Sequence, residues 1–232
     1  MGHMHQDGNG GVRADNLTRV MLRPLGSPLP LGFFAFALGT FVFSGFELGW
    51  VAPAQGRQVA ILLLAGIFPS QFVSALMAFL TRDTAGATVL SLLSASWLGL
   101  GLAFLTLKPG ATSGAIGLYL LGLTGALLIF GGVAVMGRAL FGVAMLIGVP
   151  RYLLIALFEL NGHQGLERAS GVVGLVLAGV AAYGGIALLV EDFMQRTILP
   201  VGRRAHARTS LEGELAHQLE RLAREPGVRS QL

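Results

Sequence analysis

The chain has 232 residues, of which 53% are hydrophobic and 12% are charged, about half the charged share of a typical soluble domain. Its formal net charge is +4, and it contains 34 glycines and no cysteine, so disulfides, thiolate metal sites and cysteine nucleophiles are excluded. The sequence also lacks a His/Glu metal motif, a phosphate-binding glycine loop and a nucleophile elbow. We therefore predict no enzyme activity, no cofactor and no metal site.

The first 26 residues form a polar leader without a signal-peptide cleavage pattern, and we expect a mobile cytoplasmic segment there. Apolar windows follow, four of them uncharged and as long as a bilayer core requires, which is about 20 residues. Two weaker windows complete the set, one ending at Glu47 and one interrupted by Arg151. The six windows are 31–46, 58–81, 84–107, 109–137, 139–160 and 169–190. We predict an all-α membrane protein with six transmembrane helices, in which residues 27–202 form a transporter or channel domain.

Beyond residue 202 the character of the sequence changes. Residues 203–232 are basic, and leucines recur there at about one helical turn from Leu211 to Leu222. Thr209 and Glu212 have the spacing of a capping box. This pattern predicts a short amphipathic helix on the cytoplasmic side, which either bundles with copies from other subunits or lies on the membrane surface.

The basic residues indicate the orientation. Six spans put both termini on one side of the membrane, and that side holds most of the arginines, whereas the other side holds only Arg57, Lys108 and Arg168. By the positive-inside rule we predict that both termini are cytoplasmic, in a bacterial inner (plasma) membrane. The same distribution argues against nucleic acid as a partner.

Polar side chains follow one face on each of the first three predicted helices. They are Thr40, Ser44 and Glu47, which share a face with Phe36 at spacings of four, four and three; Ser70, Gln71 and Ser74, just after Pro69; and Thr84, Thr88, Ser91 and Ser94. One interpretation is that Thr40, Ser44, Gln71, Ser74, Thr88 and Ser91 line a narrow, partly wet path. The other is that each hydroxyl bonds back to its own helix or to a neighbour. The set as a whole, with Gln71 in it, favours the path.

Arg151 is the unexpected charge. Thirteen residues separate it from Arg138 at the cytoplasmic end, which at about 1.5 Å each places it roughly 20 Å into a core about 30 Å thick. A charge facing lipid there costs at least a few kcal/mol, so two interpretations are better. Arg151 pairs with Glu47 as a structural partner, or it faces the pore and attracts anions, since a guanidinium holds a carboxylate with two hydrogen bonds. The two are compatible if both groups share one site.

The ends of the predicted core resemble the acetate uptake transporter family, the YaaH-type acetate/succinate permeases. "SPLPLGFFAF", residues 27–36, is similar to the family's N-terminal Asn-Pro-Ala-Pro-Leu-Gly motif, and "RTILPVG", residues 196–202, to its C-terminal Arg-Thr-Val-Leu-Pro-Ile-Gly motif. The segment 70–97 follows the family's second and third helices without a gap, including Gln71 and Trp97.

This resemblance implies a homohexamer in the membrane lipid, with one pore per subunit for small monocarboxylates, above all acetate and in some members succinate. It also implies a pore constriction at Phe36, at Leu93 in place of a tyrosine, and near Gly148; Arg151 replaces an apolar residue. Two alternatives stay open. One is a channel for a small neutral solute or the protonated acid, with Arg151 purely structural. The other is a membrane scaffold or sensor that acts through its C-terminal helix.

Overall fold

A computed structural model describes residues 26–108, 110–194 and 196–202. The polar leader and the helix predicted after Thr209 lie outside the described residues. The helices discussed below all belong to the unit Ser27–Ala207.

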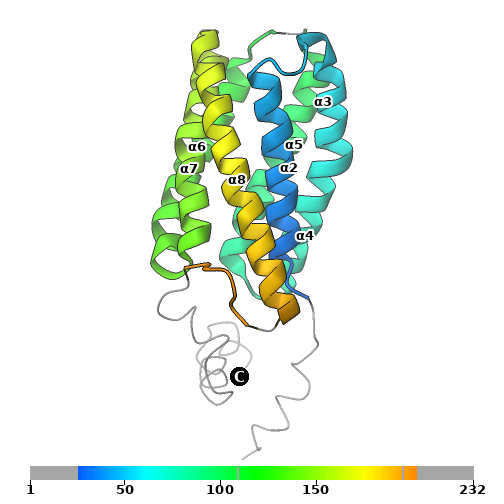
Figure 1. The fold of residues 1–232 in the computed structure, drawn as a ribbon. Helices are drawn as coiled ribbons and strands as arrows, with labels where there is room; N and C mark the ends of the chain where they lie inside the picture. Colours follow the sequence, from blue (N-terminus) through cyan, green and yellow to red (C-terminus); the bar gives the residue numbers. More distant parts are fainter. Residues whose placement is uncertain (1–25, 109, 195, 203–232) are drawn as a thin grey trace, which may run out of the picture. The chain divides into compact units, whose positions relative to one another are not determined.

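The predicted number of spans is confirmed: within the described residues, six helical segments are long and apolar enough to cross a membrane. Eight of the twelve boundaries fall within three residues of the windows' ends. The second span begins five residues earlier than its window, the fourth begins five residues later, and the last helix begins earlier and ends later than its window. The segments are α2 (Leu29–Glu47); the run of η1 (Pro53–Gln55), α3 (Gly56–Leu62), η2 (Leu63–Ile67) and α4 (Phe68–Leu80); α5 (Thr84–Thr106); α6 (Gly114–Gly137); α7 (Ala139–Asn161); and α8 (Gln164–Met194). Figure 1 shows these segments side by side along a common direction.

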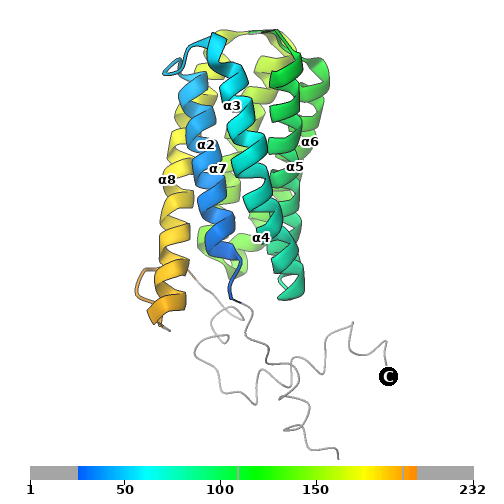
Figure 2. The same cartoon turned by 90° about the vertical axis from the view of Figure 1, so that its right-hand side faces the viewer.

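The spans close into a ring. Helix α2 packs on α4, α4 on α5, α5 on α6, α6 on α7, α7 on α8, and α8 on α2. In Figure 2, α2 lies between α8 and the α3–α4 run. Because α8 separates α2 from α7 in this order, a side chain of α2 that meets one of α7 does so inside the ring.

Apolar side chains are exposed on the outside of every span. Examples are Phe41 on α2, Leu80 on α4, Ile129 on α6 and Phe193 on α8, which is 84% exposed. Soluble monomers rarely expose apolar patches of this extent. The interior combines a buried apolar cluster with several buried polar groups, so an apolar exterior of this extent fits a lipid surrounding.

The second span is irregular next to its proline. Residues Leu63–Ile67 form a π-helical turn directly before Pro69, which has no N–H for the carbonyl of Ala65, four residues earlier. The hydroxyl of Ser70 donates to the Gly66 carbonyl at 2.8 Å. Ser70 therefore stabilises its own backbone.

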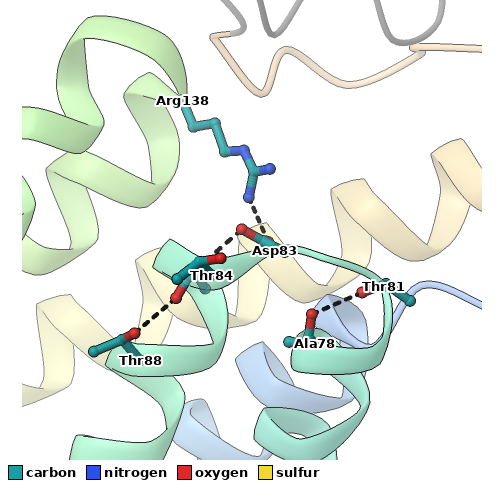
Figure 3. Close-up of polar contacts among 7 residues, drawn as sticks. Ala78, Thr81, Asp83, Thr84, Thr88 and Arg138 are labelled. Carbon is teal, nitrogen blue, oxygen red and sulfur yellow. Dashed lines mark hydrogen bonds and ion pairs between the residues drawn. The ribbon is translucent and has the colours of Figure 1, made fainter. Parts of the chain in front are cut away.

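At one end of the ring, which we call the Leu29 end, Arg138 connects two helix junctions. Its Nη1 lies 2.5 Å from Oδ2 of Asp83, so the α6–α7 junction contacts the turn between α4 and α5 (Figure 3). Asp83 is also the N-cap of α5, since its Oδ1 accepts from the N–H of Gly86 at 3.1 Å. We call the opposite end, where α2 stops, the Glu47 end.

The segment 196–202 also closes the Leu29 end. The N–H groups of Ala139 and Leu140, at the start of α7, donate to the carbonyls of Gly202 and Val201 at 3.0 and 3.3 Å. The hydroxyl of Tyr183 donates to the Pro200 carbonyl at 3.1 Å. This segment, orange in Figure 1, therefore runs from the end of α8 to the start of α7.

The two roles of Asp83 predict unequal effects. We expect Asp83→Ala to lower the free energy of unfolding by about 1–2 kcal/mol, because it removes an N-cap as well as an ion pair. Arg138→Ala removes only the half-exposed ion pair and should cost about 0–1 kcal/mol. The measurement is the midpoint of thermal unfolding in detergent, with Asp83→Asn, which keeps a capping oxygen, expected to behave like Arg138→Ala. An equal loss in all three variants would contradict the capping role.

Candidate functional site

A buried ion pair joins α2 and α7 across the interior. Nη1 of Arg151 donates to Oε1 of Glu47 at 2.7 Å, and the two side chains are only 4% and 1% exposed. Nη1 also contacts the hydroxyl of Ser170 on α8, which in turn donates to the Arg151 carbonyl at 3.0 Å. The predicted pairing of Arg151 with Glu47 is therefore present, and the Arg151 side chain does not face lipid.

Small residues on α8 make room for the guanidinium. Ser170 and Gly174 lie one turn apart on the face toward Arg151. A Cβ atom at Gly174 would come within 2.6 Å of Arg151 Nε and would also meet the hydroxyl of Ser44. On the other side, the Arg151 Cζ atom lies 5.5 Å from the ring centroid of Phe43, within the range of a cation–π contact.

A wide cavity leads to this pair from the Glu47 end. Its volume is about 600 Å³, and Glu47 and Ile155 are part of its lining. The other charged residues that line it are Arg57, Lys108, Glu159, Glu167 and Arg168. We call this cavity the vestibule. The vestibule therefore carries both signs of charge and ends at Glu47.

A second, much smaller cavity lies beyond the pair. Its volume is about 10 Å³, room for about one water molecule. Thr40, Trp97, Arg151 and Tyr152 contribute to its lining, and Ile155 lines both this cavity and the vestibule. The ion pair and Ile155 therefore stand between the two spaces.

Four buried polar atoms in the interior of the ring have no hydrogen-bond partner among the described residues. They are Thr40 Oγ1, Ser44 Oγ, Glu47 Oε2 and Gln71 Nε2. Three of the four lie on the α2 face predicted from the spacing. Native proteins leave few buried polar groups unpaired, so these atoms are suited to bind water or a polar solute.

Two of the three residues predicted to form the constriction, Phe36 and Leu93, belong to the same buried apolar cluster. Phe36 and Leu93 are 3% and 1% exposed, and Phe36 lies one turn from Thr40 toward the Leu29 end. The Phe36 ring packs on Trp97 at 6.2 Å between centroids, and the Trp97 indole N–H donates to Gln71 Oε1 at 2.7 Å. Gly148, however, is at the α6–α7 contact: a Cβ atom there would meet Leu127 of α6 at 3.3 Å.

The remaining predicted polar residues lie elsewhere. The hydroxyl of Ser74 is buried and donates to the Pro28 carbonyl at 2.6 Å. Thr88 is only partly buried and donates to the Thr84 carbonyl of its own helix at 2.7 Å (Figure 3). Ser91 is half-buried on the same helix. For Ser74 and Thr88 the structure matches the second interpretation, in which hydroxyls bond to backbone.

Four residues of the site were not singled out by the sequence: Phe43, Tyr152, Ser170 and Gly174. Tyr152 follows Arg151 directly and is 5% exposed. A serine and a glycine four residues apart are common in transmembrane helices. Nothing in the sequence alone indicates that this pair meets the arginine.

A ring of apolar spans around buried polar groups defines a multi-pass membrane protein of the transporter or channel class. The sequence profile of the GPR1/FUN34/yaaH family matches residues 9–202, and the chain belongs to this family of membrane transporters. The resemblance indicated by the end motifs is thereby confirmed, and the chain is of a transporter class and not an enzyme class.

Relatives come from fungi and bacteria. The chain is 30% identical over 204 residues to the Saccharomyces cerevisiae "Ammonia transport outward protein 2", covering 80% of this chain and 70% of the relative. It is 27% identical over 191 residues to the Escherichia coli "Succinate-acetate/proton symporter SatP", covering 77% and 96%. The solved "Structure of the bacterial acetate channel SatP" shares the fold, with a TM-score of 0.69 at 20% identity, covering 77% of this chain and 100% of that chain.

The close approach at Gly174 gives a stability prediction. We expect Gly174→Ala to destabilise the protein by about 1–3 kcal/mol, because the added methyl group displaces Arg151 or Ser44 from a packed position. The matched control is Gly179→Ala on the same helix, where a Cβ atom would meet nothing within 4 Å and helix propensity should improve by up to about 1 kcal/mol. Thermal unfolding in detergent compares the two, and similar shifts would contradict the packing argument.

Proposed function

We propose that this protein is a membrane transporter or channel for acetate and similar small monocarboxylates, with succinate as the largest candidate substrate. The observation that carries the proposal is the buried guanidinium of Arg151, placed between a wide vestibule and a face with unpaired hydroxyls. Guanidinium groups bind carboxylates through two parallel charge-assisted hydrogen bonds. The names of the bacterial relatives, a succinate-acetate/proton symporter and an acetate channel, support the same substrate class.

The path in this proposal runs along α2. A carboxylate enters the vestibule, passes Ile155, meets Arg151 with Thr40 and Ser44, and reaches the constriction at Phe36 and Leu93. Gln71 flanks that constriction through Trp97. Arg151, three residues beyond Gly148, takes the α7 position on the path, because Gly148 packs on α6. Thr88, Ser91 and Ser74 are left out of the path.

The assembly and the location are part of the proposal. We infer a homohexamer with one pore in each subunit, in which the exposed apolar faces contact lipid and neighbouring copies. We also infer a bacterial inner membrane with both termini cytoplasmic, which puts the vestibule outside. The excess of arginine in the terminal sequences and the nearly complete coverage of the bacterial relatives support this. Native mass spectrometry of the purified protein tests the number of subunits.

A second candidate is a channel for a small neutral solute, ammonia in particular. The yeast relative at 30% identity is named an ammonia transport protein, and the ion pair of Arg151 with Glu47 leaves the interior without net charge there. In this case Arg151 is structural. Ammonia flux is measured from the internal pH of vesicles that are exposed to an ammonium gradient. The scaffold alternative is tested separately: transport that survives deletion of residues 209–232 argues against it.

The carboxylate proposal predicts a loss of flux at Arg151. In liposomes containing the purified protein, with protein-free vesicles subtracted, we expect Arg151→Gln to lower radiolabelled acetate uptake about tenfold or more, as removal of a charged hydrogen-bond donor implies. Arg138→Gln makes the same change of charge at the Leu29 end, where Arg138 is half exposed, and should leave uptake within about twofold of wild type.

The double variant Arg151→Gln with Glu47→Gln removes the complication of an unpaired buried carboxylate, which is strongly destabilising. If the double variant assembles and still lacks uptake, the anion-binding role is supported. If assembly and uptake both return, Arg151 is a structural residue and the carboxylate proposal loses its main support.

A separate prediction concerns Phe36. We expect Phe36→Ala to raise flux or to admit larger carboxylates such as butyrate, because truncation of the ring opens an apolar constriction. The control is Phe41→Ala on the same helix, whose side chain is 52% exposed on the outer surface. Uptake of acetate and butyrate is compared in both variants. An unchanged ratio in an assembled Phe36→Ala protein would assign Phe36 to core packing.

A further inference from the structure

The two carboxylate oxygens of Glu47 have different surroundings. Oε1 accepts from Arg151 at 2.7 Å and lies 3.5 Å from the Ser170 hydroxyl. Oε2 is buried and has no hydrogen-bond partner among the described residues. Glu47 is also one of the residues that line the vestibule, so the water of the vestibule is the nearest source of a proton for this side chain. The free oxygen is therefore a place where one proton can bind.

Glu47 occupies the position that a substrate carboxylate needs. The small cavity beside Arg151 holds about 10 Å³, and acetate is larger than the single water molecule that such a space accepts. Substrate therefore reaches the guanidinium only if the Glu47 carboxylate moves away from it. The unpaired hydroxyls of Thr40 and Ser44 lie on the same face and offer further hydrogen bonds to the incoming carboxylate.

The net charge of the site limits how a substrate carboxylate can replace Glu47 on Arg151. When Glu47 is the only carboxylate beside Arg151, the ion pair is neutral. With two ionised carboxylates beside one guanidinium, the buried site would carry a net negative charge, which a low-dielectric interior strongly disfavours. A proton on Glu47 restores neutrality, since Arg151 then has one anionic partner as before.

We propose that a substrate carboxylate replaces Glu47 on Arg151 as Glu47 binds one proton from the vestibule, so that one proton accompanies each carboxylate through the site. An O–H bond forms at Glu47, and the proton leaves when the substrate is released and Glu47 returns to Arg151. The proposal rests on the function proposed above and adds the group that carries the proton.

Other charged groups face the same region. Arg151 and Tyr152 on α7 and Glu167 on α8 act electrostatically on Glu47, and the vestibule also contains Arg57, Lys108, Glu159 and Arg168. Glu159 accepts from the N–H of Ser113 at 2.7 Å. Of the carboxylates that line the vestibule, Glu47 is the one hydrogen-bonded to Arg151. Glu159 is therefore a matched control, a buried carboxylate outside the exchange.

The test measures protons and acetate together. The full chain, purified in detergent and weakly buffered with a pH indicator, is mixed with acetate at matched pH, and bound radiolabelled acetate is measured by equilibrium dialysis. Wild type and Glu159→Gln should take up about one proton per acetate bound. Glu47→Gln, which keeps a hydrogen-bonding side chain but binds no proton, should bind acetate with no proton uptake.

The pH dependence provides a measurement that needs no variant. If binding takes up one proton, the apparent Kd of wild type for acetate rises about tenfold per pH unit wherever the free site holds no proton and the occupied site holds one. In Glu47→Gln the Kd should not change over that range. A wild-type Kd that stays constant over that range overturns the exchange even if Glu47→Gln fails to assemble on gel filtration. A tenfold rise per pH unit also fits binding of the neutral acid, and the constant Kd of Glu47→Gln assigns the proton to Glu47.

Each outcome has one meaning. Acetate binding to wild type without proton uptake, or one proton per acetate in Glu47→Gln, overturns the exchange and leaves the carboxylate function standing. No acetate binding to wild type overturns the proposed function, and the exchange with it. In vesicles, the exchange makes uptake respond to a pH gradient and not to membrane potential, and Glu47→Gln should reverse that preference.

Discussion

The ion pair between Glu47 and Arg151 is the constraint around which the interior is arranged. Both side chains are almost completely buried, and an arginine left unpaired at membrane depth would be costly. The neighbours follow from that requirement: Ser170 contacts the guanidinium, Gly174 leaves space for it, and Phe43 covers it. Three helices are therefore held in register by one charge. A buried pair of this kind is often no more stabilising than apolar packing, so stability alone does not explain why it is present.

The ring of helices explains how the pair is accommodated. In lipid, apolar side chains gain nothing by turning inward, so helices associate through close packing and polar contacts. Glycines provide the close packing: a Cβ atom at Gly32 would come within 2.8 Å of Leu90, and one at Gly184 within 2.7 Å of Phe33. Phe41 of α2 is turned outward, whereas the polar face of α2 is turned inward and lies among buried apolar side chains such as Phe36 and Phe43. That face is where the partnerless hydroxyls and the ion pair lie.

The spans could be predicted from the sequence because bilayer thickness sets a length that apolar windows reveal directly. The α2 face could be predicted because a helical period places Thr40, Ser44 and Glu47 together. The same reasoning was less successful on α5, because the helical period predicts which residues share a face but not which neighbouring helix that face contacts. The Thr88 hydroxyl, for example, bonds to its own helix. The resemblance placed Gly148 at the constriction to within a residue or so. A shift of less than one turn along α7 is enough to move a residue from the contact with α6, where Gly148 lies, to the interior, where Arg151 lies. Ser170 and Gly174 are defined by a contact between distant segments, which no local pattern reports.

A substrate site already occupied by an internal carboxylate has a consequence for selectivity. A free buried guanidinium would hold any small anion tightly, and a site that binds too tightly slows release. When Glu47 is the resting partner, a substrate gains only the difference between its own interaction with Arg151 and that of Glu47. Two similar carboxylates differ little in this respect, so binding is weak enough to reverse, whereas chloride offers a single centre of charge in place of two oxygens and competes poorly with Glu47. Within the proposed function, the internal carboxylate thus serves as the reference against which each permeating anion is compared.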